Sequence, residues 1–168
     1  MSSDITLRRA TVDDADVLAY HRAEMFRDMG DLPDALYTEL EDTTRAWIEA
    51  AIPAGEYVAW VASPVGAKEI VAGAGLQLRP LMPRPLARRE IIGGRQGLIV
   101  NVFTERAWRR RGIAELLMRE LMMWARGNAV ASLVLHASPE GRRLYERLGF
   151  EQTNEMRYVG TGEVERGG

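Results

Sequence analysis

The stretch of sequence that decides the fold is residues 98–114, which read LIVNVFTERAWRRRGIA. The first six residues, Leu98 to Phe103, form an almost continuous apolar run, which is typical of a strand buried on both faces. A basic turn follows, and after the turn apolar residues recur at helical spacing. We therefore predict a strand, a turn and an amphipathic helix. The apolar stripe of that helix consists of Ile113, Leu116, Leu117, Leu121 and Trp124.

The turn between this strand and helix, Arg109 to Ala114, has the chemistry of an anion site. The first backbone N–H groups of a helix have no partner within it, so they can bind phosphate. Gly112 permits close approach of the backbone to an anion, and the small Ala114 allows the helix to pack near the sheet. Arginine at a helix start opposes the helix dipole, and a bound pyrophosphate would offset that conflict. The alternative interpretation is a basic surface turn with a glycine needed only for its geometry.

The sequence on either side of this stretch predicts an α+β fold with a mixed, mostly antiparallel central sheet flanked by helices. Thr11 and Asp14 give a helix-start signal of the capping-box type, and Gly30 suits the end of that helix. A hairpin turn at residues 64–68 joins two further strand patterns. The remaining predicted elements are a strand at residues 5–8, a helix at 44–52, strands at 56–63, 69–79 and 132–135, a helix from Ser138 to Gly149, and a strand at 150–158.

Residues 80–96 contain three prolines, two adjacent glycines and several arginines, and we predict an irregular loop there. Three roles remain open for this loop: covering an acceptor site, forming a contact in a homodimer, or keeping the surface soluble. The chain has 168 residues, which predicts a single domain over residues 1–159. Four glycines in residues 160–168 predict a disordered tail.

Composition excludes several classes of protein. The chain has no cysteine and only two histidines, so we expect no disulfide, no cysteine nucleophile and no metal site. A formal charge of −2 argues against a nucleic-acid partner, because such proteins are usually basic. No apolar stretch approaches the ~20 residues of a membrane helix, so we expect no membrane partner. The lack of cysteine fits a cytoplasmic location, which we expect. Arginine clusters in a mildly acidic chain indicate instead a small anionic ligand.

Two motifs resemble those of the GCN5-related N-acetyltransferase (GNAT) superfamily. Residues 101–114 resemble its central motif, a strand followed by Arg/Gln-x-x-Gly-x-Gly/Ala, and residues 144–150 (LYERLGF) resemble its tyrosine-bearing helix and the Gly-Phe that follows. The order of the motifs and of the predicted elements also agrees. The resemblance implies the acyl-CoA N-acyltransferase fold, with acetyl-CoA as the acyl-donor cosubstrate and no metal. It also implies an amine acceptor, either a small molecule or a peptide.

The resemblance further implies which residues bind the cosubstrate. The backbone of Val102, Phe103 and Thr104 would pair with the pantetheine arm, and their side chains are equally suited to the core. Ser138 stands where many relatives carry an asparagine that bonds to pantetheine, and it is equally suited to capping the next helix. The pyrophosphate contacts map, mostly through backbone N–H groups, onto Arg110, Arg111, Gly112, Ile113 and Ala114, and Arg109 fills the Arg/Gln position of the motif.

Tyr145 resembles the general acid of this family, which protonates the departing thiolate. A phenol pKa of ~10 lies close enough to a thiol pKa of ~8.5 for proton transfer as the C–S bond breaks. Tyr145 also shares a helix face with apolar residues, so a core role is the alternative. The general base is unassigned; the candidates are Glu24, Asp28, Glu105 and His136. We expect an acetyltransferase, and the alternative is a non-catalytic acyl-CoA-binding sensor or scaffold on the same fold.

Overall fold

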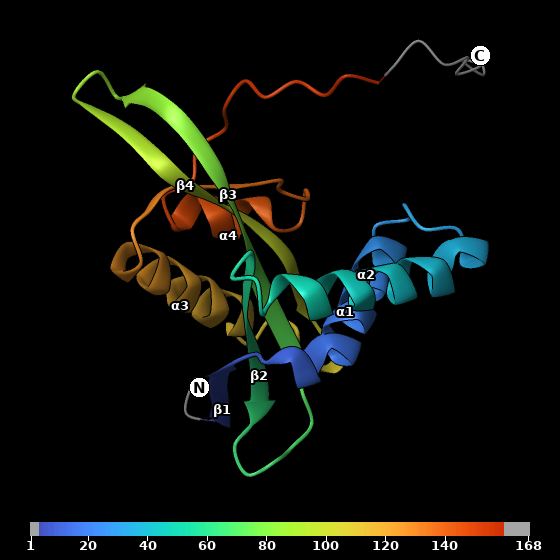
Figure 1. Ribbon diagram of the computed structural model, residues 1–168. Coiled ribbons are helices and arrows are strands. Elements are labelled where there is room, and N and C mark those ends of the chain that lie inside the picture. Colours follow the sequence, from blue (N-terminus) through green and yellow to red (C-terminus); the bar gives the residue numbers. More distant parts are fainter. Residues whose placement is uncertain (1–3, 160–168) are drawn as a thin grey trace. The chain divides into compact units, whose positions relative to one another are not determined.

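The computed structural model describes residues 4–159, which form two compact units, 4–136 and 137–159 (Figure 1). The tail predicted to be disordered, 160–168, lies outside the described residues. The single domain expected over residues 1–159 stays a prediction. Over the part of the chain that the structure describes, no helix is both long and apolar enough to cross a membrane.

The first unit is built on one five-stranded sheet whose strands lie side by side in chain order. Every neighbouring pair is antiparallel except β4 and β5, which run parallel and are joined through a helix. The predicted mixed, mostly antiparallel sheet is therefore confirmed. The strands are β1 (Ile5–Arg9), β2 (Tyr57–Pro64), β3 (Ala72–Leu86), β4 (Glu90–Thr104) and β5 (Val130–Leu135).

Helices cover both faces of this sheet (Figure 1). Helices α1 (Ala15–Asp28) and α2 (Tyr37–Ala51) lie on one face, where the rings of His21 and Phe103 are 4.9 Å apart. Helix α3 (Ile113–Gly127) lies on the other face, where Trp124 meets Trp60 of β2 edge to face at 6.0 Å. The predicted stripe of α3 is buried at Ile113, Leu117 and Leu121 and half-buried at Leu116 and Trp124.

The first helix begins at the predicted capping signal. A short 3₁₀ turn, η2 (Val12–Asp14), precedes α1, and the backbone N–H of Thr11 donates to the carboxylate of Asp14 at 2.8 Å. Gly30, with a φ of +77°, follows the helix end as expected. The second helix begins seven residues before the predicted Thr44. Its first two turns are mostly polar and carry no apolar stripe, and they are helical because α2 packs along α1.

The prediction of an irregular loop at residues 80–96 was wrong, because β3 and β4 continue through it as a two-stranded hairpin arm (Figure 1). Proline is tolerated there because neither β2 nor β5 pairs with the outer part of the arm, which leaves both its edges free. The turn at its tip places Ala87 and Arg88 at φ values of +47° and +58°. Hairpin turns of this kind usually contain Asn-Gly, so the sequence lacked the usual signal.

The second unit contains one short helix. Helix α4 (Arg142–Arg147) starts after the predicted position, because Ser138 to Gly141 form turns, and Gly149 with a φ of +93° ends it as expected. The strand predicted at residues 150–158 was wrong. Residues 151–159 are exposed and pair with no described strand, and an isolated extended segment has no partner for its backbone hydrogen bonds.

We predict that Asp14→Asn lowers the free energy of unfolding by about 1–2 kcal/mol, because it weakens a cap and an ion pair that is partly screened. Arg8 donates two hydrogen bonds of 2.8 Å to the Asp14 carboxylate, and mainly for this reason the pKa of Asp14 is lowered. A lowered pKa stabilises the fold above the unfolded value and loses that effect as pH falls through the folded value. The stability difference should therefore be constant from about pH 5 to 7 and shrink below about pH 4.

Chemical denaturation at several pH values measures this difference. Asp13→Asn is the matched control, because Asp13 is the exposed neighbour in the same turn, and it should change stability by no more than about 0.5 kcal/mol. An equal loss in both variants, or a difference that does not depend on pH, would contradict the assigned role of Asp14.

Candidate active site

The central feature of the site is that β4 loses one of its two neighbours halfway along. Strand β5 pairs with β4 from Arg95 to Ile99 and no further, whereas β3 stays paired with β4 as far as Thr104. From Val100 onward, no described strand of the first unit lies on the β5 side of β4. An open edge of this kind can pair its backbone with an extended ligand. Val102 and Phe103, both predicted to bind pantetheine, lie on this edge.

A β-bulge at Asn101 accompanies the change. Gly73 pairs with Phe103 and Gly75 with Val100, so Asn101 and Val102 together oppose one residue of β3. Asn101 has a φ of +59°, which asparagine tolerates better than most residues, and its amide donates to the Leu18 carbonyl of α1 at 2.9 Å. Asn101 is 3% exposed. We did not single it out from the sequence, although a lone polar residue in an apolar strand run was a usable signal.

The arginine-rich turn follows β4 directly. A 3₁₀ turn, η4 (Arg106–Trp108), leads into it, and α3 starts at Ile113. Arg110 and Gly112 have φ values of +62° and +76°, and Arg111 between them is not in the left-handed region. Backbone that alternates in this way turns successive N–H groups toward one side and forms an anion-binding concavity.

The turn is unobstructed at Gly112. A Cβ atom at Gly112 would meet nothing within 4 Å. No described residue accepts a hydrogen bond from the backbone N–H groups of Arg110 to Ala114. The turn therefore presents unpaired backbone donors, and the binding of a pyrophosphate there stays a prediction.

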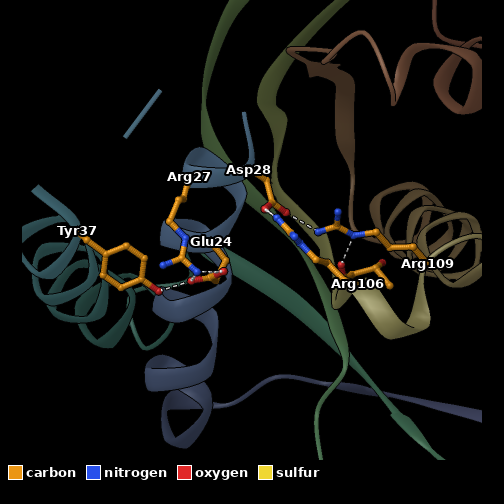
Figure 2. A network of polar contacts seen from close by, with 7 residues as sticks. Glu24, Arg27, Asp28, Tyr37, Arg106 and Arg109 are labelled. Carbon is orange, nitrogen blue, oxygen red and sulfur yellow. Dashed lines mark hydrogen bonds and ion pairs between the residues drawn. The ribbon is translucent and has the colours of Figure 1, made fainter. Parts of the chain in front are cut away.

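The arginine side chains of the turn divide into two kinds (Figure 2). Arg106 and Arg109 both bind the carboxylate of Asp28, at the end of α1, and Arg109 also donates to the Thr104 carbonyl at 2.8 Å. Arg110 and Arg111 have no described carboxylate partner. Arg109, predicted to bind the cosubstrate, is thus engaged in holding the turn against α1, and the carbonyl of Thr104 is occupied by the same contact.

Two of the candidate bases, Asp28 and Glu24, are each bound by neighbouring side chains (Figure 2). Arg106 and Arg109 lower the pKa of Asp28, with the Arg106 hydrogen bond as the largest cause, which makes Asp28 a poor proton acceptor. Glu24 accepts a hydrogen bond of 2.7 Å from the Tyr37 hydroxyl and binds Arg27. Its side chain is only 13% exposed, so it is not a solvated surface group. Glu105 is half-buried and His136 is exposed, and nothing distinguishes either as the base.

A pocket of about 280 Å³ lies on the helix-covered face beside the bulge. Its wall is formed by the two N-terminal helices and the middle three strands. It does not involve residues 25–37, which join α1 to α2. The lining residues are Arg22, Thr43, Thr44, Trp47, Ile48, Tyr57, Gln77, Val100 and Asn101.

The remaining predicted residues, Ser138 and Tyr145, lie in the second unit. The Ser138 hydroxyl accepts a hydrogen bond of 3.2 Å from the Gly141 N–H, which is the capping role considered as its alternative. Tyr145 is half-buried, its ring meets that of Phe150 at 6.3 Å, and burial raises its pKa. Because the units are placed separately, the geometry between Tyr145 and β4 stays a prediction.

Comparison with known proteins identifies the family. The model of the acetyltransferase (GNAT) family matches residues 22–150. A crystal structure of a GCN5-related N-acetyltransferase from Ralstonia eutropha JMP134 is 30% identical, with a TM-score of 0.82 over 94% of this chain and 99% of that one. A predicted acetyltransferase from Clostridium acetobutylicum, crystallised with acetyl-CoA, is 25% identical, with a TM-score of 0.76 over 93% of this chain and 96% of that one.

A curated relative from rice, Oryza sativa subsp. japonica, is named glucosamine 6-phosphate N-acetyltransferase 1. It is 28% identical over 115 residues, which make up 68% of this chain and 66% of that protein. The structural neighbours have the same open, mixed sheet flanked by helices. The residues that the family model matches include both the bulged part of β4 and the arginine-rich turn. The chain belongs to the acetyltransferase (GNAT) family.

Proposed function

We propose that this protein transfers an acetyl group from acetyl-CoA to the primary amine of a small molecule or peptide. The observation that carries the proposal is the open edge of β4 leading directly into the turn at Arg110–Ala114. An extended pantetheine arm fits an unpaired strand edge, and a pyrophosphate fits the concavity of N–H groups that follows. A structural neighbour crystallised with acetyl-CoA supports this choice of cosubstrate.

In the proposed reaction the acetyl group passes directly from the thioester to the amine. The amine nitrogen attacks the thioester carbonyl carbon, so that a C–N bond forms and the carbonyl oxygen takes the negative charge. A backbone N–H near Phe103 or Thr104 stabilises that oxygen. When the C–S bond breaks, Tyr145 donates its hydroxyl proton to the sulfur. The amine nitrogen loses its proton to a base that we leave unassigned. No step requires a metal.

The comparisons suggest one chemical class for the acceptor. The name of the rice relative gives an amino sugar phosphate as the acceptor of that protein, and this class is one candidate here. A cytoplasmic location and a homodimer contact through the β3–β4 arm stay predictions. The alternative function, an acyl-CoA sensor or scaffold, shares the same turn and strand edge and differs only in lacking turnover.

We predict that Gly112→Ala weakens acetyl-CoA binding by about tenfold, the equivalent of about 1.4 kcal/mol. The new methyl group would occupy the open space in front of the turn and strain a left-handed residue. Gly66→Ala is the matched control, because Gly66 has nearly the same φ, +79°, and equally open surroundings, but lies in the β2–β3 turn. Both variants should lose similar stability in denaturation, and only Gly112→Ala should lose affinity in calorimetry. Equal affinities would show that the pyrophosphate does not bind at Gly112.

We predict that Tyr145→Phe lowers turnover at least about tenfold and leaves acetyl-CoA affinity nearly unchanged, because it removes only the proton donor. Thiol release measures turnover, and the absence of cysteine keeps the background low. Tyr158→Phe, an 84% exposed tyrosine of the same unit, is the control. Full activity in Tyr145→Phe would remove Tyr145 as the acid. Acetyl-CoA binding by the unmodified protein without acetylation of any amine would favour the sensor.

A further inference from the structure

The pocket beside the bulge contains two buried polar atoms that lack partners. The Tyr57 hydroxyl and the Asn101 Oδ1 atom make no well-aligned hydrogen bond with any described residue, although Tyr57 is 2% exposed and Asn101 is 3% exposed. The Asn101 side chain is near enough to the Tyr57 hydroxyl to oppose the effect of burial on the pKa of Tyr57. Buried polar groups without partners are costly and uncommon in native proteins. Because both residues line the pocket, a ligand there would supply the missing hydrogen bonds.

The orientation of both groups is set by the fold. The Asn101 amide must direct its N–H toward Leu18, because a backbone carbonyl can only accept, and this leaves Oδ1 as a free acceptor. The Tyr57 hydroxyl lies across β3 at Gly75, where a Cβ atom would come within 1.9 Å of it. Burial raises the pKa of Tyr57 to about 12, so its hydroxyl keeps its proton and can donate at neutral pH.

Arg22 gives the pocket its charge. It is the only charged side chain among the described residues that line the pocket, and no described carboxylate lies within ion-pair distance of it. Its guanidinium is half-buried and stacks over Phe26 at 5.0 Å, and burial lowers its pKa. The other arginines of α1, α2 and η4 are paired with acids, and they are Arg27, Arg45 and Arg106. A desolvated cation without a counter-ion favours an anionic ligand.

From these three groups we propose that Arg22 selects an acceptor carrying an oxyanion, either a carboxylate or a phosphate, alongside its amine. Asn101 Oδ1 and the Tyr57 hydroxyl then bind neutral polar groups of the same acceptor. Polyamines and other purely cationic acceptors are disfavoured, because they would meet Arg22 in a pocket whose described lining offers no acid. This inference rests on the proposed acetyl transfer and adds the charge class of the acceptor.

The test uses the full chain with matched amines. Glucosamine is compared with glucosamine 6-phosphate, and serine amide with serine, so that phosphate and carboxylate are examined in separate arms; spermidine represents the cations. We expect kcat/KM to be at least about tenfold higher for the anionic member of at least one pair. Arg22→Gln should remove that preference, lowering kcat/KM for the anionic acceptor by roughly tenfold to a hundredfold, mainly through KM. Arg22→Lys should restore part of it.

Two controls separate specificity from folding. Arg126→Gln, an exposed arginine of α3 on the other face of the sheet, should leave all kinetic constants unchanged. Acetyl-CoA affinity and thermal unfolding should be the same in Arg22→Gln as in the unmodified protein. A general loss of affinity for acetyl-CoA would mean that Arg22 supports the structure, and it would overturn the inference.

The remaining outcomes distinguish this inference from the proposed function. Direct binding of each amine is therefore also measured by calorimetry, independently of turnover. Arg22-dependent binding of an anionic amine without acetylation would support the inference and contradict the proposed function. Efficient acetylation of neutral or cationic amines, unaffected by Arg22→Gln, would support the proposed function and overturn the inference. The inference would also be overturned if no anionic amine bound to the protein and none was acetylated.

Discussion

Strand β4 has hydrogen-bonding partners on both sides only as far as Ile99, and the rest of the site depends on this change of pairing. The bulge at Asn101 adds one residue to β4, and a bulge bends and twists its strand. Beyond it β4 follows β3 alone, and the side that β5 leaves is open. Asn101 fixes the bulge to α1 through the Leu18 carbonyl, so the irregularity of the sheet and the position of the first helix are linked by one hydrogen bond.

The two candidate ligand sites follow from that arrangement. The open edge of β4 leads into the N–H groups of Arg110–Ala114, while the helix-covered face beside the bulge contains the pocket with Arg22, Tyr57 and Asn101. Asp28 links the two regions, because it extends from α1 and holds Arg106 and Arg109 of the turn. The arginines of this region therefore fall into two pairs. One pair of guanidinium groups positions the turn, and Arg110 and Arg111 remain without carboxylate partners.

Some elements could be predicted because local chemistry determines them. The Thr11–Asp14 cap, the glycines after α1 and α4, and the apolar stripe of α3 all depend on residues close in sequence. The β3–β4 arm was missed because its prolines and glycines are ordinary loop signals. They are compatible with strands only where the edges are unpaired, and pairing is a property of the whole sheet. The strand predicted after Phe150 was wrong because a strand needs a neighbouring strand to pair with, and the sequence of the segment does not show whether one is present.

By itself the sequence determined the fold class, the glycine turn before α3 and the family, because each depends on a local pattern: an apolar strand run, Gly112 at a helix start, and the residues around Tyr145. The tertiary structure alone decided which of the described arginines pair with a carboxylate, since Asp28 lies about 80 residues before Arg109 in the chain and meets it only through folding. It also decided the charge of the pocket. Arg22, Tyr57 and Asn101 belong to three separate elements, and burial beside one another, without a carboxylate, is what gives them a common chemical role.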